Sequence, residues 1–219
     1  MKKFLSLSLA LMLMIFLASC GNNSSKIDEN KISAQSSTPA ENKKDSAKKS
    51  LVVFFSRTGD NYEVGVIEKG NTHIVADFIA EAVDADMFEI KPVTPYPADY
   101  RECTQVANRE KEADARPAFV GKIENFDTYD TIYLGYPNWW SDMPMIMYTF
   151  LESYDFTGKT IIPFCTSSSE AFIGKEEIEK YAKGVKEVRD GLGIHGKRCQ
   201  ENPESVKRDV NNWLKKVNS

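Results

Sequence analysis

The stretch Leu51-Val52-Val53-Phe54-Phe55 is apolar at every position, and the polar stretch Ser56-Arg57-Thr58-Gly59-Asp60-Asn61 ends it at once. A short run of β-branched and aromatic residues without alternation is typical of a strand that is buried on both faces of a parallel sheet. The polar stretch predicts a loop at the carboxyl end of this strand, where ligands of open α/β sheets bind.

Helix and strand patterns alternate from this strand to the end of the chain. A helix is expected from Asn71, with Asn71 or Thr72 as N-cap and an apolar stripe behind it. Further helices are expected over 100–115 and 144–151, from about residue 175 and from Pro203, and further strands over 86–90, 131–136, 160–165 and 185–188. This alternation predicts an α/β fold, a doubly wound five-stranded parallel sheet.

The N-terminal part of the chain indicates export. Lys2 and Lys3 precede a short apolar run over residues 4–18, as in a secretory signal. The run ends in Leu17-Ala18-Ser19-Cys20, which resembles the lipobox of bacterial lipoproteins and implies that Cys20 is lipidated. The alternative is an ordinary cleaved signal with a chance cysteine.

Three parts of the chain follow from this interpretation. Residues 1–19 are a lipoprotein signal peptide, 20–50 are the lipidated cysteine and a polar flexible linker, and 51–219 are one domain. The expected location is extracytoplasmic, lipid-anchored to a bacterial membrane.

Composition excludes several classes of protein. A net charge of −4 without a basic stripe disfavours nucleic acid as a partner, and 42% hydrophobic residues exclude wholesale disorder. After Cys20, three cysteines remain, and a disulfide between Cys103 and Cys199 stays open. Metal-binding, P-loop and common hydrolase motifs do not occur, so no metal is expected.

Three loops after predicted strands are the candidate site. The first, together with Gly70-Asn71-Thr72, offers hydroxyls and a helix N-terminus for an anion. The second, Pro137-Asn138-Trp139-Trp140, offers aromatic rings that can stack on a flat ligand, although both indoles could instead pack structurally. The third, Thr166-Ser167-Ser168-Ser169, allows a close approach of the backbone.

A glycine-rich stretch, two histidines and a cysteine are not expected to belong to the site. Gly191-Leu192-Gly193-Ile194-His195-Gly196 matches GxGxxG, but it is interpreted as a turn-rich loop because no helix is expected to open directly after it. His73 and His195 have no motif partner, and Cys165 is taken as a buried apolar residue.

Taken together, the three loops resemble those of the flavodoxin family, in the form with a Trp-Trp second loop. The resemblance covers residues 51–217 and implies the flavodoxin-like strand order 2-1-3-4-5, with bound flavin mononucleotide (FMN). It implies that Ser56, Arg57, Thr58, Asn71 and Thr72 hold the phosphate, and that the flavin ring lies between two sets of residues. These are Pro137, Asn138, Trp139 and Trp140 on one side and Thr166, Ser167 and Ser168 on the other.

Two departures from the family pattern stand out. Residues 60–69 are inserted in the phosphate loop, and they either cover the flavin or form an inert surface loop. The third loop has Ser168-Ser169-Glu170 where relatives often have glycines.

Asp142, after the second loop, is expected to oppose an anionic flavin by like-charge repulsion.

The expected function is that of a flavoprotein that carries electrons to a redox partner protein or reduces a small quinone-like acceptor. The flavin supplies the redox chemistry, so no catalytic side chain is assigned. The alternative is a flavin-free binding lipoprotein on a flavodoxin scaffold.

Overall fold

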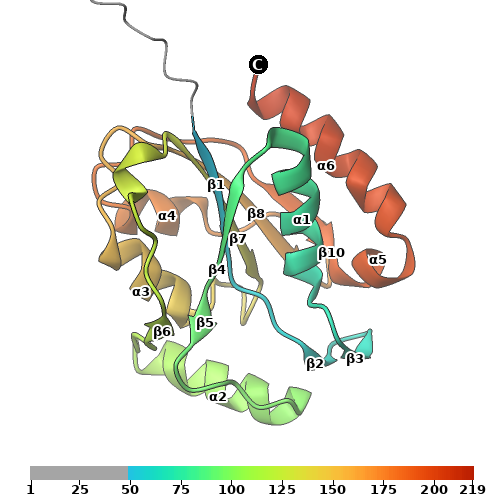
Figure 1. Cartoon of the computed structure of the whole chain (residues 1–219). Helices are drawn as coiled ribbons and strands as arrows, with labels where there is room; N and C mark the ends of the chain where they lie inside the picture. The colour runs from blue at the N-terminus through green and yellow to red at the C-terminus, as the bar shows by residue number, and fades with distance from the viewer. Residues whose placement is uncertain (1–48) are drawn as a thin grey trace, which may run out of the picture. The chain divides into compact units, whose positions relative to one another are not determined.

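The computed structural model describes residues 49–219, so the predicted signal segment, Cys20 and nearly all of the linker lie outside the described residues. A parallel sheet forms the centre of the domain (Figure 1). Its main strands are β1 (Ser50–Phe54), β4 (Asp86–Glu89), β7 (Thr131–Pro137), β8 (Thr160–Ser167) and β10 (Leu192–His195). They are ordered β10-β8-β7-β1-β4, and the short β9 (Glu187–Val188) pairs with the start of β8. Counted along the chain, the main strands have the expected order 2-1-3-4-5, which confirms the predicted fold class.

Helices cover both faces of the sheet, each over its own apolar core. On one face lie α1 (Asn71–Val83), α5 (Gly196–Glu201) and α6 (Pro203–Val217), with a core that includes Phe54 and Phe164. On the other face lie α3 (Met145–Ser153) and α4 (Lys175–Tyr181), with a core that includes Phe55 and Phe150. Neighbouring β1 residues point to opposite faces, so the continuous apolar run serves both cores.

The carboxyl edge of the sheet carries additional elements. The predicted insertion folds into a hairpin of β2 (Gly59–Asn61) and β3 (Gly65–Ile67). Helix α2 (Tyr100–Glu112) lies at the same end of the molecule (Figure 1). Just after β4, β5 (Lys91–Pro92) pairs with β6 (Phe119–Val120), and the 3-10 turn η1 (Phe126–Thr128) precedes β7.

The sequence-based assignment of the last strand was wrong. Residues 185–188 contribute only the two residues of β9, and the fifth main strand is β10, inside the stretch that was expected to be a turn-rich loop. Helix α5 opens directly after β10. Glycines permit close contacts there: a Cβ at Gly193 would lie 2.4 Å from the carbonyl oxygen of Glu170, and one at Gly196 would lie 2.6 Å from Asn71 Nδ2. The glycine pattern therefore serves packing of the strand and the helix.

The N-cap of α1 also differs from the prediction. Gly70 occupies this position, not Asn71 or Thr72. The hydroxyl that accepts from the helix comes from the preceding loop, where Ser56 Oγ lies 3.1 Å from the His73 amide nitrogen. By contrast, α6 begins at Pro203 as predicted, and Asn202 is its N-cap.

Two further findings concern residues 49–219. In this part of the chain, no helix is both long and apolar enough to cross a bilayer. Cys103, Cys165 and Cys199 are all buried and free, so Cys103 and Cys199 are not joined in this structure.

Candidate functional site

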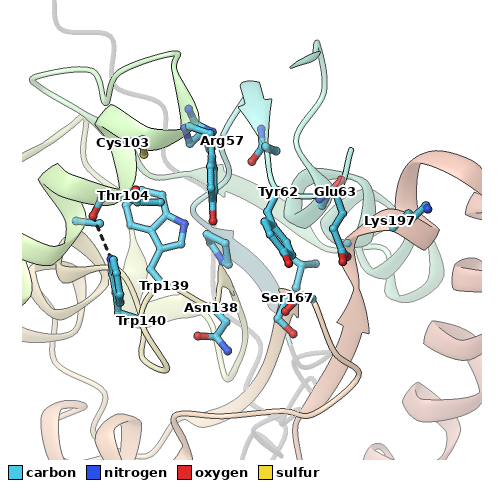
Figure 2. A pocket seen from close by; sticks show the side chains of 18 residues that line it. Arg57, Tyr62, Glu63, Cys103, Thr104, Asn138, Trp139, Trp140, Ser167 and Lys197 are labelled. Atoms are coloured by element: carbon cyan, nitrogen blue, oxygen red, sulfur yellow. Dashed lines mark hydrogen bonds between the residues drawn. The ribbon is translucent and has the colours of Figure 1, made fainter. Parts of the chain in front are cut away.

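A cavity of ≈ 390 Å³ opens at the carboxyl edge of the sheet, between the three predicted loops (Figure 2). Most of the predicted site residues line it. They are Arg57, Asn71, Pro137, Asn138, Trp139, Trp140, Thr166, Ser167 and Ser168. The side chains of Ser56, Thr58 and Thr72 lie outside the lining.

Ser56 and Thr72 support the cavity from behind. Ser56 accepts from the amide of His73, while Thr72 Oγ1 lies 2.8 Å from Thr166 Oγ1 in the buried interior. The His73 amide is occupied by this hydrogen bond, which leaves the amides of Asn71 and Thr72 as the available donors in the first turn of α1. A helix N-terminus with such amides is a site for an anion.

Arg57 is engaged with the protein backbone. Its guanidinium donates to the carbonyl oxygens of Pro97 (2.8 Å), Ala98 (2.7 Å) and Asp60. The side chain thereby ties the first loop to the segment that leads into α2. Its role in this structure is to fix the wall of the cavity.

Trp139 is a half-buried wall residue. Its ring lies edge-on to Tyr96 at 4.9 Å and to Phe55 at 5.4 Å, measured between ring centroids. Its neighbour Asn138 has a buried side-chain oxygen, Oδ1, which finds no hydrogen-bond partner among residues 49–219. A buried acceptor without a partner beside a cavity indicates a place for a ligand donor.

Trp140 lies at the mouth of the cavity and is 54% exposed. Trp140 and Ser141 both have left-handed backbone conformations, with φ of 55° and 59°. They connect Trp139 to Asp142, whose backbones pair at N–O distances of 2.9 and 3.2 Å. Non-glycine residues in such conformations cost on the order of 1–3 kcal/mol each and gather at functional sites.

Asp142 does not have the role expected of it. Its carboxylate lies outside the lining of this cavity and is paired with Lys111 Nζ at 3.2 Å. Its other oxygen accepts from the amide of Met143 and from the hydroxyl of Tyr148, both at 2.7 Å. The charge of Asp142 is therefore compensated, which removes the basis for repulsion of an anionic flavin.

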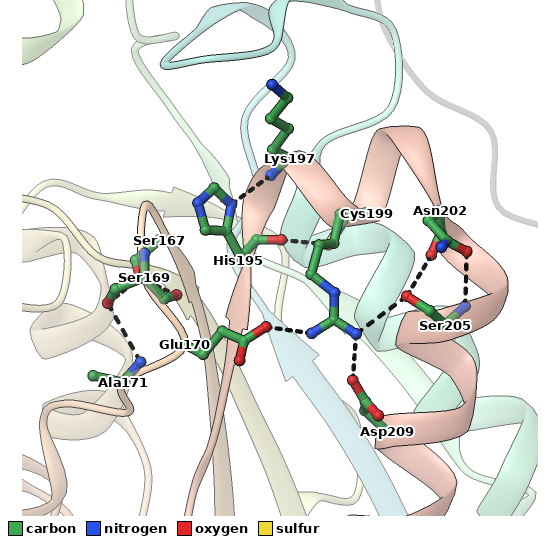
Figure 3. Close-up of polar contacts among 11 residues, drawn as sticks. Ser167, Ser169, Glu170, Ala171, His195, Lys197, Cys199, Asn202, Ser205 and Asp209 are labelled. Carbon is green, nitrogen blue, oxygen red and sulfur yellow. Dashed lines mark hydrogen bonds and ion pairs between the residues drawn. The ribbon is translucent and has the colours of Figure 1, made fainter.

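The third loop is held by its own hydroxyls and by an arginine from α5. Ser167 Oγ lies 2.8 Å from the carbonyl oxygen of Ser169 and 3.0 Å from its amide nitrogen (Figure 3). Arg198 binds Glu170 of the loop and Asp209 of α6. Glu170 thus anchors the loop to the helical layer.

The sequence-based analysis missed half of the cavity wall. Helix α2 contributes Tyr100, Cys103, Thr104 and Ala107. Their spacing of three and four residues places them on one helix face, which was the available signal. The hairpin contributes Asn61, Tyr62 and Glu63, so the insertion lines the cavity and is not an inert loop.

The β10–α5 junction supplies the remaining wall and a polar contact to the hairpin. Gly196 and Lys197 line the cavity. His195 Nε2 lies 3.5 Å from Glu63 Oε2, while its Nδ1 accepts from the amide of Lys197. The GxGxxG stretch therefore does contribute to the cavity, although as a strand end and helix start.

Burial shifts the pKa values of two ionisable groups on α2, the cavity-lining Cys103 and, behind the lining, Glu110. Burial raises the pKa of the Cys103 thiol, and the nearby Arg57 opposes this shift only in part. Burial also raises the pKa of Glu110, whose carboxylate accepts from the hydroxyl of Tyr96 at 2.8 Å. A helix N-terminus beside aromatic side chains is suited to binding a flat, anionic ligand.

Comparisons with known proteins agree with this geometry. A protein-family model described as flavodoxin matches residues 49–217. A search of curated proteins finds no match. Among solved structures, a candidate flavoprotein from Bacteroides uniformis is 34% identical with a TM-score of 0.58, and the alignment covers 77% of this chain and 98% of that one.

Two further structures extend the comparison. A candidate flavoprotein from Bacteroides eggerthii is 27% identical, with a TM-score of 0.59, and 79% of this chain and 99% of that one are covered. A flavoprotein from Lactobacillus acidophilus, solved in complex with FMN, is 20% identical with a TM-score of 0.52, covering 71% and 98% of the two chains. At this identity, the last comparison shows the fold alone. The match over nearly the whole described domain, with the strand order and the loops at its carboxyl edge, shows that this chain belongs to the flavodoxin family.

Proposed function

We propose that the domain binds FMN in the ≈ 390 Å³ cavity and acts as a redox flavoprotein. The observation that carries this proposal is the meeting of the three loops after β1, β7 and β8 around one cavity. Membership in the flavodoxin family and the FMN complex of the similar Lactobacillus acidophilus flavoprotein support it.

The residues present fit this cofactor. The cavity has a volume typical of small-molecule sites, about 300–1,000 Å³. The N-terminus of α1 suits a phosphate, and the unpartnered Asn138 Oδ1 suits a ring N–H. Trp139 and Trp140 supply aromatic surface along one side.

Each part of the site then has a distinct task. The amides of Asn71 and Thr72 hold the phosphate, with Ser56, Thr58 and Arg57 shaping the loop around it. Asn138 fixes the orientation of the ring, and Trp139 with Thr166 excludes water from its two sides. When bound, FMN supplies reversible uptake and release of electrons, so the protein needs only to bind, orient and tune it.

The residues at the mouth of the cavity are relevant to which electron acceptor the protein uses. Tyr62, Tyr100 and Trp140 are all well exposed there, at 56%, 37% and 54%. Such a rim is open to a flat molecule or to a protein surface, and we propose transfer either to a redox partner protein or to a small quinone-like acceptor. Steady turnover with a nicotinamide and a quinone supports the small acceptor, whereas fast transfer only between proteins supports the carrier.

We further propose that the protein acts outside the cytoplasm, anchored to a bacterial membrane by lipid on Cys20. The support is the sequence Leu17-Ala18-Ser19-Cys20 after a short apolar run. Full-length protein is expected in the membrane fraction, with acyl chains on Cys20 in its mass spectrum. The Cys20→Ala variant is expected to lose both the acyl mass and the membrane association, and unchanged fractionation contradicts the anchor.

The absorption spectrum of the purified full-length protein, before and after addition of FMN, tests the central proposal. A flavin band that stays with the protein through gel filtration supports it. Phosphate recognition is tested by comparing FMN with riboflavin, since a phosphate site at the N-terminus of α1 is expected to favour FMN over riboflavin. A protein that takes up neither compound contradicts the proposal and leaves a flavin-free binding lipoprotein.

A further inference from the structure

The turn that carries Trp140 needs an external support. Trp140 and Ser141 follow each other with φ of 55° and 59°, a conformation that side chains other than glycine disfavour. Such conformations persist where the surroundings over-determine them. Burial is not that support, because Trp140 is 54% exposed and Ser141 is also exposed.

Polar contacts from α2 hold both ends of this turn. The Trp140 indole Nε1 donates to the carbonyl oxygen of Thr104 at 3.0 Å, a contact drawn in Figure 2. Lys111 Nζ donates to the carbonyl oxygen of Trp140 at 2.7 Å and lies 3.2 Å from Asp142 Oδ2. Thr104 and Lys111 are seven residues apart, two helical turns, so one face of α2 makes all these contacts.

Asp142 continues the connection to α3. Its Oδ1 accepts from the Met143 amide and from the hydroxyl of Tyr148, which lies on α3. Lys111 thus lies where α2, the Trp140 turn and α3 meet, and its single ammonium group bridges a backbone carbonyl and a fixed carboxylate. A bridge to a charged group is stronger than an ordinary hydrogen bond.

We propose that Lys111 is a positioning residue of the cofactor site, acting through Trp140. By joining α2 to the Trp140 turn, it fixes how two adjacent parts of the cavity wall meet, because Tyr100, Cys103 and Thr104 line the cavity from α2 and Trp140 lines it from the turn. We call these contacts of Lys111 and Thr104 with Trp140 and Asp142 the clamp. The effect of the clamp on FMN affinity rests on the proposed FMN binding, whereas the contacts themselves are present without a ligand.

The clamp is tested first without FMN, by tryptophan fluorescence and acrylamide quenching of the full chain. Lys111→Met is expected to shift the emission to longer wavelength and to raise the quenching constant. In a Trp140→Phe background the same substitution is expected to change neither quantity, since Trp140 is the one tryptophan of residues 49–219 that hydrogen-bonds to Lys111. Lys111→Arg is expected to behave as wild type, as is the matched control Lys175→Met, which removes an exposed lysine that pairs with Asp190 at 3.3 Å.

The consequence is tested by FMN titration. Lys111→Met is expected to raise the FMN dissociation constant about tenfold, the value of one charge-assisted hydrogen bond, while Lys175→Met leaves it unchanged. A fluorescence change that persists in the Trp140→Phe background, or no change at all, overturns the inference. Equal FMN affinity in wild type and Lys111→Met also overturns it. Failure of the wild-type protein to bind FMN overturns the proposed function instead, and the fluorescence result then decides the clamp by itself.

Discussion

The hydroxyl oxygens of Thr72 and Thr166 lie 2.8 Å apart, although 94 positions separate the two residues in the sequence. Both side chains are buried, at 1% and 4% exposure. The contact joins the first turn of α1 to the carboxyl end of β8. It therefore connects the predicted phosphate loop to the third loop beneath the floor of the cavity.

This threonine pair leads to a prediction on stability. Thr166→Val keeps the shape of the side chain but leaves the Thr72 hydroxyl buried without its partner. The free energy of unfolding is expected to fall by about 1–3 kcal/mol. The double variant Thr72→Val/Thr166→Val is expected to be more stable than the sum of the single losses predicts, because no orphan hydroxyl remains. Urea titrations measure both, with the exposed Thr94→Val as control, and additive losses contradict the pairing.

Arg57 leads to a prediction on ligand selectivity. Because its guanidinium binds backbone carbonyls of Asp60, Pro97 and Ala98, it acts on the cavity wall rather than on phosphate. Arg57→Met is expected to reduce the affinities for FMN and riboflavin by the same factor.

Lys197 provides the contrast in the same titrations. It lines the cavity next to Gly196, whose backbone approaches Asn71. Lys197→Met is expected to weaken FMN binding more than riboflavin binding, with an effect that shrinks at high salt. If Arg57→Met spares riboflavin, its guanidinium serves the phosphate directly and the structural assignment is wrong.

The backbone of Ser141 leads to a second prediction on stability. With φ of 59° and an exposed side chain, Ser141 is strained, and glycine adopts the same conformation freely. Ser141→Gly is expected to raise the free energy of unfolding by about 0.5–1 kcal/mol. This is the energetic cost of the left-handed conformation that serine bears, minus the larger loss of conformational entropy that glycine undergoes on folding. Asp84→Gly, at φ 51° at the end of α1 and distant from the cavity, is the matched control.

The two variants separate strain from function. Both are expected to stabilise the protein, but only Ser141→Gly is expected to weaken FMN binding, because it loosens the Trp140 turn. Equal FMN affinity in the two variants contradicts a functional role for the strained turn.

The buried thiols lead to a prediction on pH. Burial raises the pKa of Cys165 to about 11 and that of Cys199 to about 12. In the unfolded chain the thiols have a pKa of about 8.5. Above that pH the unfolded state is stabilised relative to the folded state, because its thiols lose protons that the folded state retains. The stability from the neutral thiols is complete below about pH 8.5 and declines as the pH rises toward 11–12.

Substitution reveals this contribution. Cys165→Ala/Cys199→Ala is expected to have a lower free energy of unfolding at pH 7 but a flatter decline from pH 8 to pH 10, measured by denaturant titration under reducing conditions. The tyrosines titrate equally in both proteins and cancel in the comparison. An unchanged slope contradicts the assigned pKa shifts.

The sequence by itself determined four of the five main strands of the sheet and the position of the site. The run 51–55 is apolar at every position because β1 is buried on both faces, and parallel strands place their loops at one edge, so three separated loops could be expected to meet. Nine of the predicted site residues consequently line one cavity.

Only the tertiary structure decided which groups are free to bind a ligand. Three polar residues at the carboxyl edge of the sheet have side chains that suit ligand binding, namely Arg57, Ser167 and Asp142. Much of their hydrogen-bonding and charge-pairing capacity is used by residues distant in sequence or by their own loop. Local pattern also failed at residues 191–196, because this stretch holds three glycines and little apolar signal, and its strand β10 is fixed by pairing with β8. The place of α2 in the cavity wall and the Lys111 bridge to Trp140 depend on chain segments that meet only in the folded domain, and helix propensity does not specify such contacts.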